Sequence, residues 1–423
     1  MRPDRGDSQR GDSQSGDAAP GPCDPLAALL SPAGRELLGR LSGEDASPGH
    51  ALRLAALLRG SYPSPLISAA LTQHALREAA RAKFSRADQM MFTRAGLEQA
   101  SSEHTARHCA ERYAGFEHVA DLCCGIGGNL LALAAGRRVL AVDSDDVNLR
   151  FARHNTEVYR AGVPEPVVPE PVVHGAGDGL TTLRADVRDA DLGGVDAVFI
   201  DPARRTGQQR LRAGHSQPPL SWCLALAAQV PAVGIKAAPG LPRELVPAGW
   251  EAEFVAIGRD LKEALLWSPA LATTGRRATV LPAGDTLTAA PGPAVPVAAP
   301  GAFLLDPSPA VTRAELVEDL ARQLGAWKID SRIAFLSADR DLRTPFARTL
   351  RVLESGPWNE RQFGRRLRAL GVGAADIRRR GLAGDVERIR HRLALQGDRR
   401  ATVVITRSND RPWGLICADP DDP

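Results

Sequence analysis

The sequence contains few lysines and few aromatic residues. Four of its 423 residues are lysine, so 49 of its 53 basic residues are arginine, and aromatic side chains make up 4% of the chain. Alanine, glycine and proline are abundant, as is typical of a GC-rich coding genome. An arginine cluster is therefore weaker support for nucleic-acid binding than it is in a lysine-balanced protein. The net charge of +3 favours no class of partner.

Paired cysteines and long apolar runs are also absent. The six cysteines form no Cys-x-x-Cys pair, so neither a disulfide framework nor a metal site is indicated. The first 25 residues are polar and do not resemble a secretory signal, and no apolar run approaches the roughly 20 residues of a membrane-spanning helix. These absences predict a cytoplasmic protein that binds no metal and no membrane.

The length of the chain predicts two or three folded domains. Residues near the start repeat Arg-Gly-Asp-Ser-Gln twice, a composition that cannot offset its ordering entropy by burial. Helical apolar spacing follows, for example at 51–58 and 66–80, and the last helices of this part are expected to contain 96–103 and 105–113. We expect a disordered tail at 1–24, a helical domain at 25–114, a parallel α/β domain at 115–290 and an α+β domain at 301–423.

Short apolar runs beginning after Phe116 predict the strands of the α/β domain. We expect seven strands, the last two forming an antiparallel pair, at 118–122, 138–142, 181–185, 197–200, 232–236, 251–257 and 263–267. The proline-rich tandem repeat at 164–173 is expected to be a surface insertion. The stretch at 282–300, rich in proline, glycine and alanine, is expected to be a linker.

The C-terminal part is more basic than the rest of the chain. Residues 311–423 contain 22 lysines or arginines and 16 aspartates or glutamates, a net charge of +6. Helical patterns at 313–324 and 360–370 alternate with strand-like runs at 333–336 and 402–406. This alternation predicts a compact α+β domain.

A glycine-rich turn after the first predicted strand is the main candidate for a ligand-binding loop. Asp121-Leu122-Cys123-Cys124-Gly125-Ile126-Gly127-Gly128-Asn129 follows an apolar strand and begins a helix. Glycines at such a turn let the backbone approach a nucleotide-like ligand closely. A dinucleotide fingerprint would require a third glycine or alanine at position 130, where this chain has Leu130. The spacing therefore favours a methyltransferase-type loop over a dehydrogenase.

Acidic residues end the next two strands. A carboxylate at Asp143, followed by Ser144, is placed to accept ribose hydroxyls, and Asp186, followed by Val187, is placed to accept an adenine amino group. Each aspartate alone is also compatible with capping a helix or turn. Their order after the glycine turn favours cofactor binding by Asp121, Gly125, Gly127, Asp143, Ser144, Asp186 and Val187.

The candidate reaction centre is Asp201-Pro202, directly after the apolar strand at 197–200 and at the carboxyl edge of the sheet. A carboxylate there is suited to orient a nitrogen nucleophile, and Pro202 fixes the backbone beside it. The alternative is that Asp-Pro simply begins a turn. Methylation of a pyrimidine carbon would need a cysteine nucleophile, and no cysteine lies in a recognisable motif for it.

Several neighbouring residues have weaker assignments. Arg204 and Arg205 begin an arginine-rich loop that is expected either to contact substrate phosphates or to be solvated. Gln99 or Ser102 is placed to touch the cofactor, although the serine is more typical of a helix cap. The remaining assignments are packing for Cys123 and Cys124 and an exposed helix face for His154 and Asn155.

These motifs resemble the class I S-adenosylmethionine-dependent methyltransferases, and more narrowly a bacterial group with a THUMP-like C-terminal domain. The resemblance covers about residues 25–423. It rests on Gln99-Ala100-Ser101-Ser102, Asp121 to Gly127, Asp201-Pro202-Ala203-Arg204-Arg205, Gly258-Arg259-Asp260-Leu261-Lys262-Glu263 and Leu304-Leu305-Asp306-Pro307-Ser308-Pro309-Ala310-Val311. It implies a Rossmann-like seven-stranded core between a helical N-terminal domain and a THUMP-like domain, with S-adenosyl-L-methionine as cofactor and RNA as substrate.

The sequence thus predicts a methyltransferase that modifies a nitrogen of structured RNA, a tRNA or an rRNA. A methyltransferase acting on a protein or a small molecule remains an alternative, with the arginines serving solubility. A non-catalytic protein that binds RNA or another partner and retains the cofactor fold is a second alternative. Methyl transfer separates this last alternative from the others.

Overall fold

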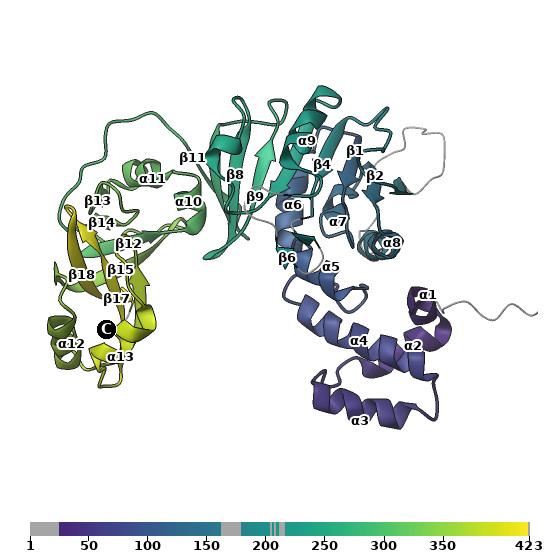
Figure 1. The fold of residues 1–423 in the computed structure, drawn as a ribbon, viewed down its shortest axis with the longest axis horizontal. Coiled ribbons are helices and arrows are strands. Elements are labelled where there is room, and N and C mark those ends of the chain that lie inside the picture. Colours follow the sequence, from purple (N-terminus) through teal and green to yellow (C-terminus); the bar gives the residue numbers. More distant parts are fainter. Residues whose placement is uncertain (1–24, 162–178, 204, 207–208, 211–215, 422–423) are drawn as a thin grey trace, which may run out of the picture. The chain divides into compact units, whose positions relative to one another are not determined.

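The computed structural model describes residues 25–161, 179–203, 205–206, 209–210 and 216–421. The expected tail at 1–24 and the tandem repeat at 164–173 lie outside these residues. The chain divides into two compact units, Met1–Leu97 and Glu98–Pro423. Each unit is described by itself below, with the element labels of Figure 1.

The described part of the first unit is helical, as expected. Its helices are α1 (Pro25–Leu30), α2 (Pro32–Leu41), α3 (Pro48–Leu58), α4 (Ser64–Ala80) and α5 (Arg94–Gln99), which crosses the boundary between the units. Ser31 caps α2 by accepting a hydrogen bond from the backbone N–H of Gly34 at 3.1 Å, and Pro32 follows at the first helical position, where its fixed φ suits the helix. The buried Gln73 of α4 bonds both the N–H and the C=O of Phe92, which fixes the segment before α5.

The second unit contains a nine-stranded sheet of order β11-β10-β8-β9-β7-β4-β1-β2-β3. Its strands are β1 (His118–Leu122), β2 (Arg138–Asp143), β3 (Leu180–Arg184), β4 (Ala197–Ile200), β7 (Ala232–Ala237), β8 (Glu251–Ile257), β9 (Asp260–Trp267), β10 (Arg276–Leu281) and β11 (Asp285–Thr288). Strands β3, β2, β1, β4 and β7 are parallel, and β9 runs antiparallel to both β7 and β8. The seven expected strands and their terminal reversal are confirmed.

Strands β10 and β11 extend the sheet beyond the expected pattern. The sequence predicts no strand at 276–281 and a linker from residue 282, but β11 folds back on β10 with Val280 paired to Asp285. Leu287 of β11 is 6% exposed, between two threonines. One buried leucine between two threonines gives the alternation of apolar and polar residues that is typical of a strand. The prolines and glycines on both sides of this short alternation made it look like a linker in the sequence.

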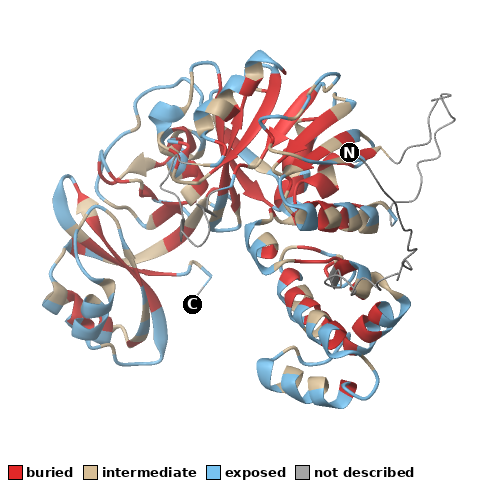
Figure 2. Ribbon diagram, turned by 45° about the vertical axis from the view of Figure 1, so that its right-hand side comes forward, coloured by how far each residue is buried: buried red, intermediate tan, exposed pale blue. Residues whose placement is uncertain are grey.

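Two apolar clusters cover the two faces of this sheet. Successive residues of a strand point to opposite faces, so Ala120 and Leu122 belong to one cluster while Val119 belongs to the other. Helices α6 (Glu103–Glu111), α7 (Leu130–Leu133), α8 (Asp146–Arg160) and α9 (Leu220–Ala225) pack around the strands. Figure 2 shows the buried residues concentrated along the strands, which form the rigid platform for the loops at their ends.

A seven-stranded sheet of order β13-β14-β12-β15-β18-β17-β16 forms the C-terminal part of the second unit. Its elements are β12 (Phe303–Pro307), α10 (Pro309–Arg313), α11 (Val317–Leu324), β13 (Trp327–Lys328), β14 (Leu336–Ala338), β15 (Ala347–Pro357), α12 (Glu360–Ala369), β16 (Val372–Arg379), α13 (Val386–Leu393), β17 (Arg399–Ser408) and β18 (Arg411–Ala418). Helices α12 and α13 pack on each other and on β16 (Figure 1).

The predicted strand at 402–406 lies within β17, but the one at 333–336 is wrong. Strand β14 begins only at Leu336, and the buried Ile333 and Phe335 precede it outside the ladder. Their apolar pattern reflects packing of a loop into a core cluster with Leu350 and Val404. Apolar periodicity alone does not distinguish such a buried loop from a strand.

Candidate functional site

The candidate site lies at the carboxyl ends of β1, β2, β4 and β7, which are neighbours in the sheet. The register pairs Leu122 of β1 with Val142 of β2 and with Ile200 of β4, and Ile200 with Ile235 of β7. Parallel strands end at the same edge, so the residues at and just beyond these positions converge there. Doubly wound sheets bind their ligands at this edge.

The glycine-rich loop after β1 has the conformation that its sequence suggests. Gly125 and Gly127 have φ values of +54° and +93°, which glycine adopts without steric cost. A Cβ atom on Gly127 would lie 3.1 Å from the Cα of Ala152 on α8. A Cβ on Gly128 would lie 3.0 Å from the backbone nitrogen of Ser101. The glycines therefore allow both α8 and the segment between α5 and α6 to pack closely against the loop.

Asp121 is buried near the end of β1, and neither of its carboxylate oxygens has a hydrogen-bond partner. Burial raises its pKa well above the usual value; the charges of Asp201 and Asp143 raise it further, and Lys236 partly opposes them. The buried Oδ1 of Asn129, on the same loop, also has no partner. Buried acceptors without a donor are costly, so this arrangement fits a ligand that supplies positive charge and donors.

Asp143 ends β2 and shapes the same loop. Its two carboxylate oxygens accept hydrogen bonds from the backbone N–H groups of Gly125 and Asp145, each at 2.9 Å. Ser144 beside it is exposed. A carboxylate has about four lone-pair positions, so Asp143 keeps acceptor capacity for the hydroxyl groups of a ribose. Its capping role, one of the two sequence interpretations, is compatible with that binding.

The loop after β3 contains Asp186 and Val187. Asp186 has a pKa lowered to about 2, chiefly because Arg188 donates side-chain hydrogen bonds to it. The Asp186 side chain is 40% exposed, whereas Val187 is 6% exposed and packs in the core cluster. The structure thus pairs the predicted adenine acceptor with an arginine two residues away.

Asp201 and the buried Pro202 follow β4 at the centre of the site. The backbone N–H of Asp201 donates to the carbonyl of Leu122 at 3.1 Å, which anchors the turn to β1. Its Oδ2 accepts a hydrogen bond from Nζ of Lys236 at 2.7 Å. Of the two predicted arginines, Arg204 lies outside the described residues, and Arg205 begins the short strand β5 (Arg205–Thr206), which pairs with β6 (Gln209–Arg210).

Three site residues were not predicted from the sequence. Lys236, on β7, is 3% exposed and also donates to Oγ of Ser101 at 2.9 Å. Ser101 in turn donates to Oε2 of Glu263 on β9 at 3.4 Å. The available signal was a single lysine within a run that is otherwise apolar, Ala232–Ala237, since a lysine in a fully buried strand requires a partner.

The structure also places the residues before α6. Ser101, which lies between the predicted Gln99 and Ser102, accepts a hydrogen bond from Lys236, and contact of Gln99 or Ser102 with the cofactor stays a prediction. Ser102 caps α6 by accepting a hydrogen bond from the backbone N–H of Thr105, a role that serine favours at this position.

Asn155 on α8 is fully buried, against expectation, and its Nδ2 donates to the carbonyl of Ile126 at 3.0 Å. Its amide thus holds the glycine loop from α8.

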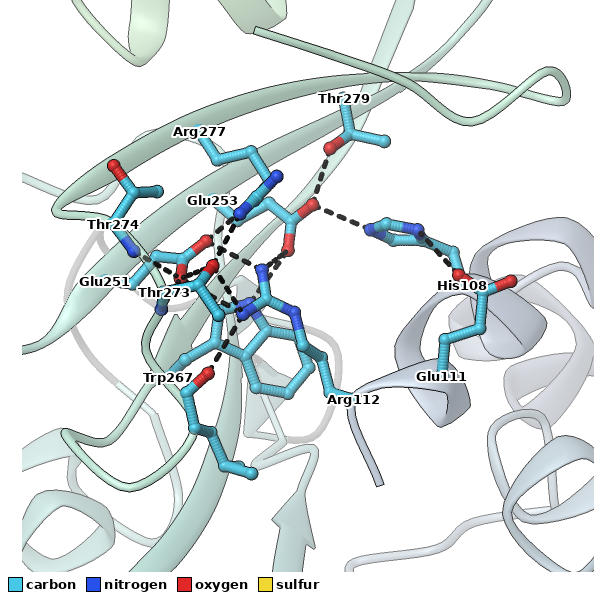
Figure 3. Close-up of polar contacts among 11 residues, drawn as sticks. His108, Glu111, Arg112, Glu251, Glu253, Trp267, Thr273, Thr274, Arg277 and Thr279 are labelled. Atoms are coloured by element: carbon cyan, nitrogen blue, oxygen red, sulfur yellow. Dashed lines mark hydrogen bonds and ion pairs between the residues drawn. The ribbon is translucent and has the colours of Figure 1, made fainter. Parts of the chain in front are cut away.

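A second polar cluster lies at the opposite, amino end of β8 (Figure 3). Glu251 and Glu253 have fully buried side chains, and Arg112, the residue that follows α6, donates to Glu251 at 2.7 Å. Burial opposes the charge of Glu253, but the hydrogen bond and charge of His108, the hydrogen bond of Thr279 and the charge of Arg112 together lower its pKa to about 2. The remaining partners of the two glutamates are Trp267, Thr273, Thr274, Arg277 and Thr279. This cluster joins α6 to the sheet at the end of β8 that lies away from the candidate site.

Comparison with known proteins shows the family. Over 333 residues the chain is 37% identical to an uncharacterised S-adenosylmethionine-dependent methyltransferase of Mycobacterium tuberculosis, found in two strains, and the match covers 75% of this chain and 85% of the relative. The chain belongs to the S-adenosylmethionine-dependent methyltransferases. It is therefore an enzyme of the methyltransferase class with S-adenosylmethionine as its cofactor, as predicted.

One solved structure shares the fold of this chain, and three family models match parts of it. A crystal structure from Porphyromonas gingivalis W83, described as a methyltransferase, superposes with a TM-score of 0.65 at 18% identity, covering 90% of this chain and 98% of that one. Three family models match parts of this methyltransferase. They are an RNA cap guanine-N2 methyltransferase at 116–202, a THUMP-like domain at 347–419 and a domain of unknown function at 23–80. The predicted THUMP-like C-terminal domain is confirmed.

The buried acceptors around the glycine loop fit the cofactor of this family. The carboxylate oxygens of Asp121 and Oδ1 of Asn129 have no hydrogen-bond donor in the protein. S-adenosylmethionine has a positively charged sulfonium and an ammonium group, and the ammonium can donate hydrogen bonds. In the part of the chain that the structure describes, no three His, Cys, Asp or Glu side chains are grouped to hold a metal ion. No helix among these residues is long and apolar enough to cross a membrane.

Proposed function

We propose that this methyltransferase transfers a methyl group to a nitrogen atom of a structured RNA, either a tRNA or an rRNA. The observation that carries the proposal is the match of residues 116–202 to the RNA cap guanine-N2 methyltransferase model. This match runs from the first strand of the sheet to Pro202, so it includes the glycine loop and the Asp-Pro turn. The THUMP-like match at 347–419 supports RNA as the substrate class.

The cofactor subsite consists of Asp121, Gly125, Gly127, Asp143, Ser144, Asp186 and Val187. In this proposal Asp121 accepts the cationic end of the cofactor, since its buried carboxylate has no other donor. Asp143 accepts the ribose hydroxyls, and the loop beginning at Asp186 lies against the adenine. When bound, S-adenosylmethionine supplies an electrophilic methyl group.

The reaction centre is Asp201 with Pro202. Oδ2 of Asp201 accepts from Lys236, and Oδ1 is left to accept an N–H of the substrate. That hydrogen bond directs the nitrogen lone pair toward the methyl group. The cofactor held by the subsite would supply the methyl group, and Asp201 would hold the acceptor nitrogen until its N–H proton leaves to solvent. Pro202, buried behind the aspartate, restricts the backbone that positions it.

In this proposal RNA is bound by the arginines that follow the Asp-Pro turn in the sequence and by arginines of the C-terminal domain. Arg204 and Arg205 follow the Asp-Pro turn directly. In the C-terminal domain, residues 360–400 contain twelve arginines and five acidic residues, and helices α12 and α13 lie in this segment. A positive surface of this kind contacts phosphates without reading sequence.

The experiment that tests this function is transfer of labelled methyl groups from S-adenosylmethionine to RNA, protein and metabolite fractions of a host that lacks the protein. We expect label in RNA, loss of that label with Asp201→Ala, and no loss with Asp191→Asn. Asp191 is an exposed turn residue of the same sheet domain and serves as a matched control. Label confined to protein or metabolites would contradict the RNA proposal.

Salt provides an independent measurement of the phosphate contacts. Binding of the RNA that accepts label is expected to weaken steeply between 50 and 200 mM salt, because phosphate neutralisation releases counterions, on the order of 1,000-fold for six contacts. An affinity that does not change with salt would contradict the assignment of the arginines to RNA.

A further inference from the structure

A buried ammonium group lies against the reaction centre, and the proposed chemistry does not yet use it. Lys236 is 3% exposed, and its Nζ lies 2.7 Å from Oδ2 of Asp201 and 2.9 Å from Oγ of Ser101. A lysine is rarely buried unless it is paired. Its aspartate partner, by contrast, has a side chain that is 22% exposed at the ligand edge of the sheet.

The hydrogen bonds around Lys236 have a consistent direction. The ammonium donates to Asp201 and to Ser101, and the hydroxyl of Ser101 donates to Oε2 of Glu263 at 3.4 Å. The same Glu263 oxygen lies 3.9 Å from Nζ of Lys236. The ammonium is therefore fixed from the buried side by a serine and a carboxylate, and it donates a hydrogen bond to the partly exposed carboxylate of Asp201.

The residues of this chain come from distant parts of the sequence. Lys236 lies on β7 and Glu263 on the neighbouring β9, whereas Ser101 belongs to the segment between α5 and α6 that packs on Gly128 of the cofactor loop. Side chains held by several rigid elements keep a fixed geometry. Asp201 thus receives its hydrogen bond from a group that cannot easily move.

We infer that Lys236, held by Ser101 and Glu263, is a positioning residue that fixes the Asp201 carboxylate toward the acceptor nitrogen of the substrate. The inference rests on the proposed role of Asp201 as the group that orients the nucleophile. The ammonium occupies Oδ2 and leaves Oδ1 for the substrate.

The kinetic test compares Lys236→Met with the wild-type enzyme. A misplacement of about 1 Å in a catalytic group costs on the order of 100-fold in rate, so we expect kcat for methyl transfer to fall by roughly 10- to 100-fold. We expect the Kd for S-adenosylmethionine, measured by calorimetry, to change by less than about threefold, because the altered contact is to Asp201. A cofactor affinity weakened more than tenfold with unchanged kcat would overturn the inference.

A double-mutant cycle tests whether Lys236 acts through Asp201. In an Asp201→Asn background, Lys236→Met is expected to reduce kcat by no more than about threefold, since residues that share one function are not additive. Equal effects in both backgrounds would show that the lysine acts elsewhere. Lys262→Met is the matched control, because Lys262 is an exposed lysine adjacent to Glu263 on β9.

Chemical rescue distinguishes positioning from a structural role. Lys236→Ala leaves space for a three-carbon amine. We expect n-propylammonium to restore activity in a saturable manner and n-propanol not to restore it.

Ser101→Ala is a second variant, which keeps the ammonium group and tests the inference if the lysine variants fold poorly. We expect it to lower kcat less than the lysine variants do, by about three- to tenfold. Loss of thermal stability in parallel with activity, with no rescue, would contradict the inference.

The RNA proposal can fail separately from this one. If wild-type enzyme labels protein or metabolites instead of RNA, the same variants are assayed on the labelled fraction. The role of Lys236 is then tested on that fraction by the same comparison, in which kcat is expected to fall while the Kd for the cofactor changes little. If Lys236→Met labels RNA as fast as wild type, the inference is wrong while the RNA proposal stands.

Discussion

Replacement of Asp121 by asparagine is expected to stabilise the protein without cofactor and to weaken cofactor binding. The carboxylate is 1% exposed, and neither oxygen has a donor. A buried polar group left unsatisfied costs about 1–3 kcal/mol, and more when it is charged. At pH 8 we therefore expect Asp121→Asn to raise the free energy of unfolding of the cofactor-free enzyme by about 1–3 kcal/mol. The charge-assisted bonds lost to the cofactor are worth about 1.5–3 kcal/mol, or roughly a 10- to 100-fold weaker Kd.

The stability gained in Asp121→Asn is expected to depend on pH. Burial, Asp201 and Asp143 raise the pKa of Asp121 above its ordinary value of 3.8, so the folded protein holds this proton more tightly than the unfolded chain. The stability from this proton is fully present below pH 3.8 and is lost as the pH rises through the folded-state pKa. The gain from Asp121→Asn should therefore be larger at pH 8 than at pH 5.

Urea unfolding followed by tryptophan fluorescence measures the stability, and calorimetry measures the affinity. Asp196→Asn is the control, because this exposed carboxylate accepts a hydrogen bond from His118 N–H in the same sheet. It should leave cofactor affinity unchanged. A less stable Asp121→Asn enzyme at pH 8 that binds S-adenosylmethionine as tightly as wild type would refute the assignment of Asp121.

Three further predictions concern the packing of the sheet domain. Cys123 has φ +59°, and the left-handed region costs about 1–2 kcal/mol for a residue with a side chain, so Cys123→Gly should destabilise less in urea unfolding than Cys124→Gly. Gly128→Ala would place a Cβ 3.0 Å from backbone and should lower stability by about 1–3 kcal/mol. Glu253→Gln should lower stability by about 3–5 kcal/mol, and wild-type stability from Glu253 should be lost as the pH falls from 4.5 towards about 2.

Each of these has a control or a contradicting result. A Cys123→Gly enzyme that unfolds more easily than Cys124→Gly would refute the backbone argument. Gly39→Ala, in a helix with open space around the new Cβ, should stabilise by about 0.5–1 kcal/mol. An acid-unfolding curve of Glu253→Gln identical to that of wild type would show that the glutamate contributes nothing above its pKa.

The acidic residues at the strand ends of the site could be predicted from the sequence, because a short apolar run next to each of them marks the strand. Asp121 is the second-last residue of its parallel strand, Asp143 is the last residue of the next one and Asp201 follows a third, and strands of that kind end at one edge. Their convergence followed from secondary structure alone. Asp186 was located in the same way, but its pairing with Arg188 was not foreseen because it depends on side-chain conformation.

The buried partners were not predictable from local patterns. Lys236 and Ser101 are 135 residues apart, and Ser101 and Glu263 are 162 apart. No periodicity links such positions, so only tertiary packing reveals the chain of hydrogen bonds. Asn155 was misplaced for a similar reason, because a polar residue on an amphipathic helix is normally exposed, whereas this one serves the glycine loop.

The most direct measurement of the central claim is the identity of the methylated nucleoside. RNA labelled by the wild-type enzyme is digested to nucleosides and analysed by mass spectrometry, with Asp201→Ala in parallel. We predict one nucleoside with the methyl group on nitrogen, present with wild-type enzyme and absent with the variant. A methyl group on carbon or on a ribose oxygen, or equal labelling by Asp201→Ala, would contradict the account.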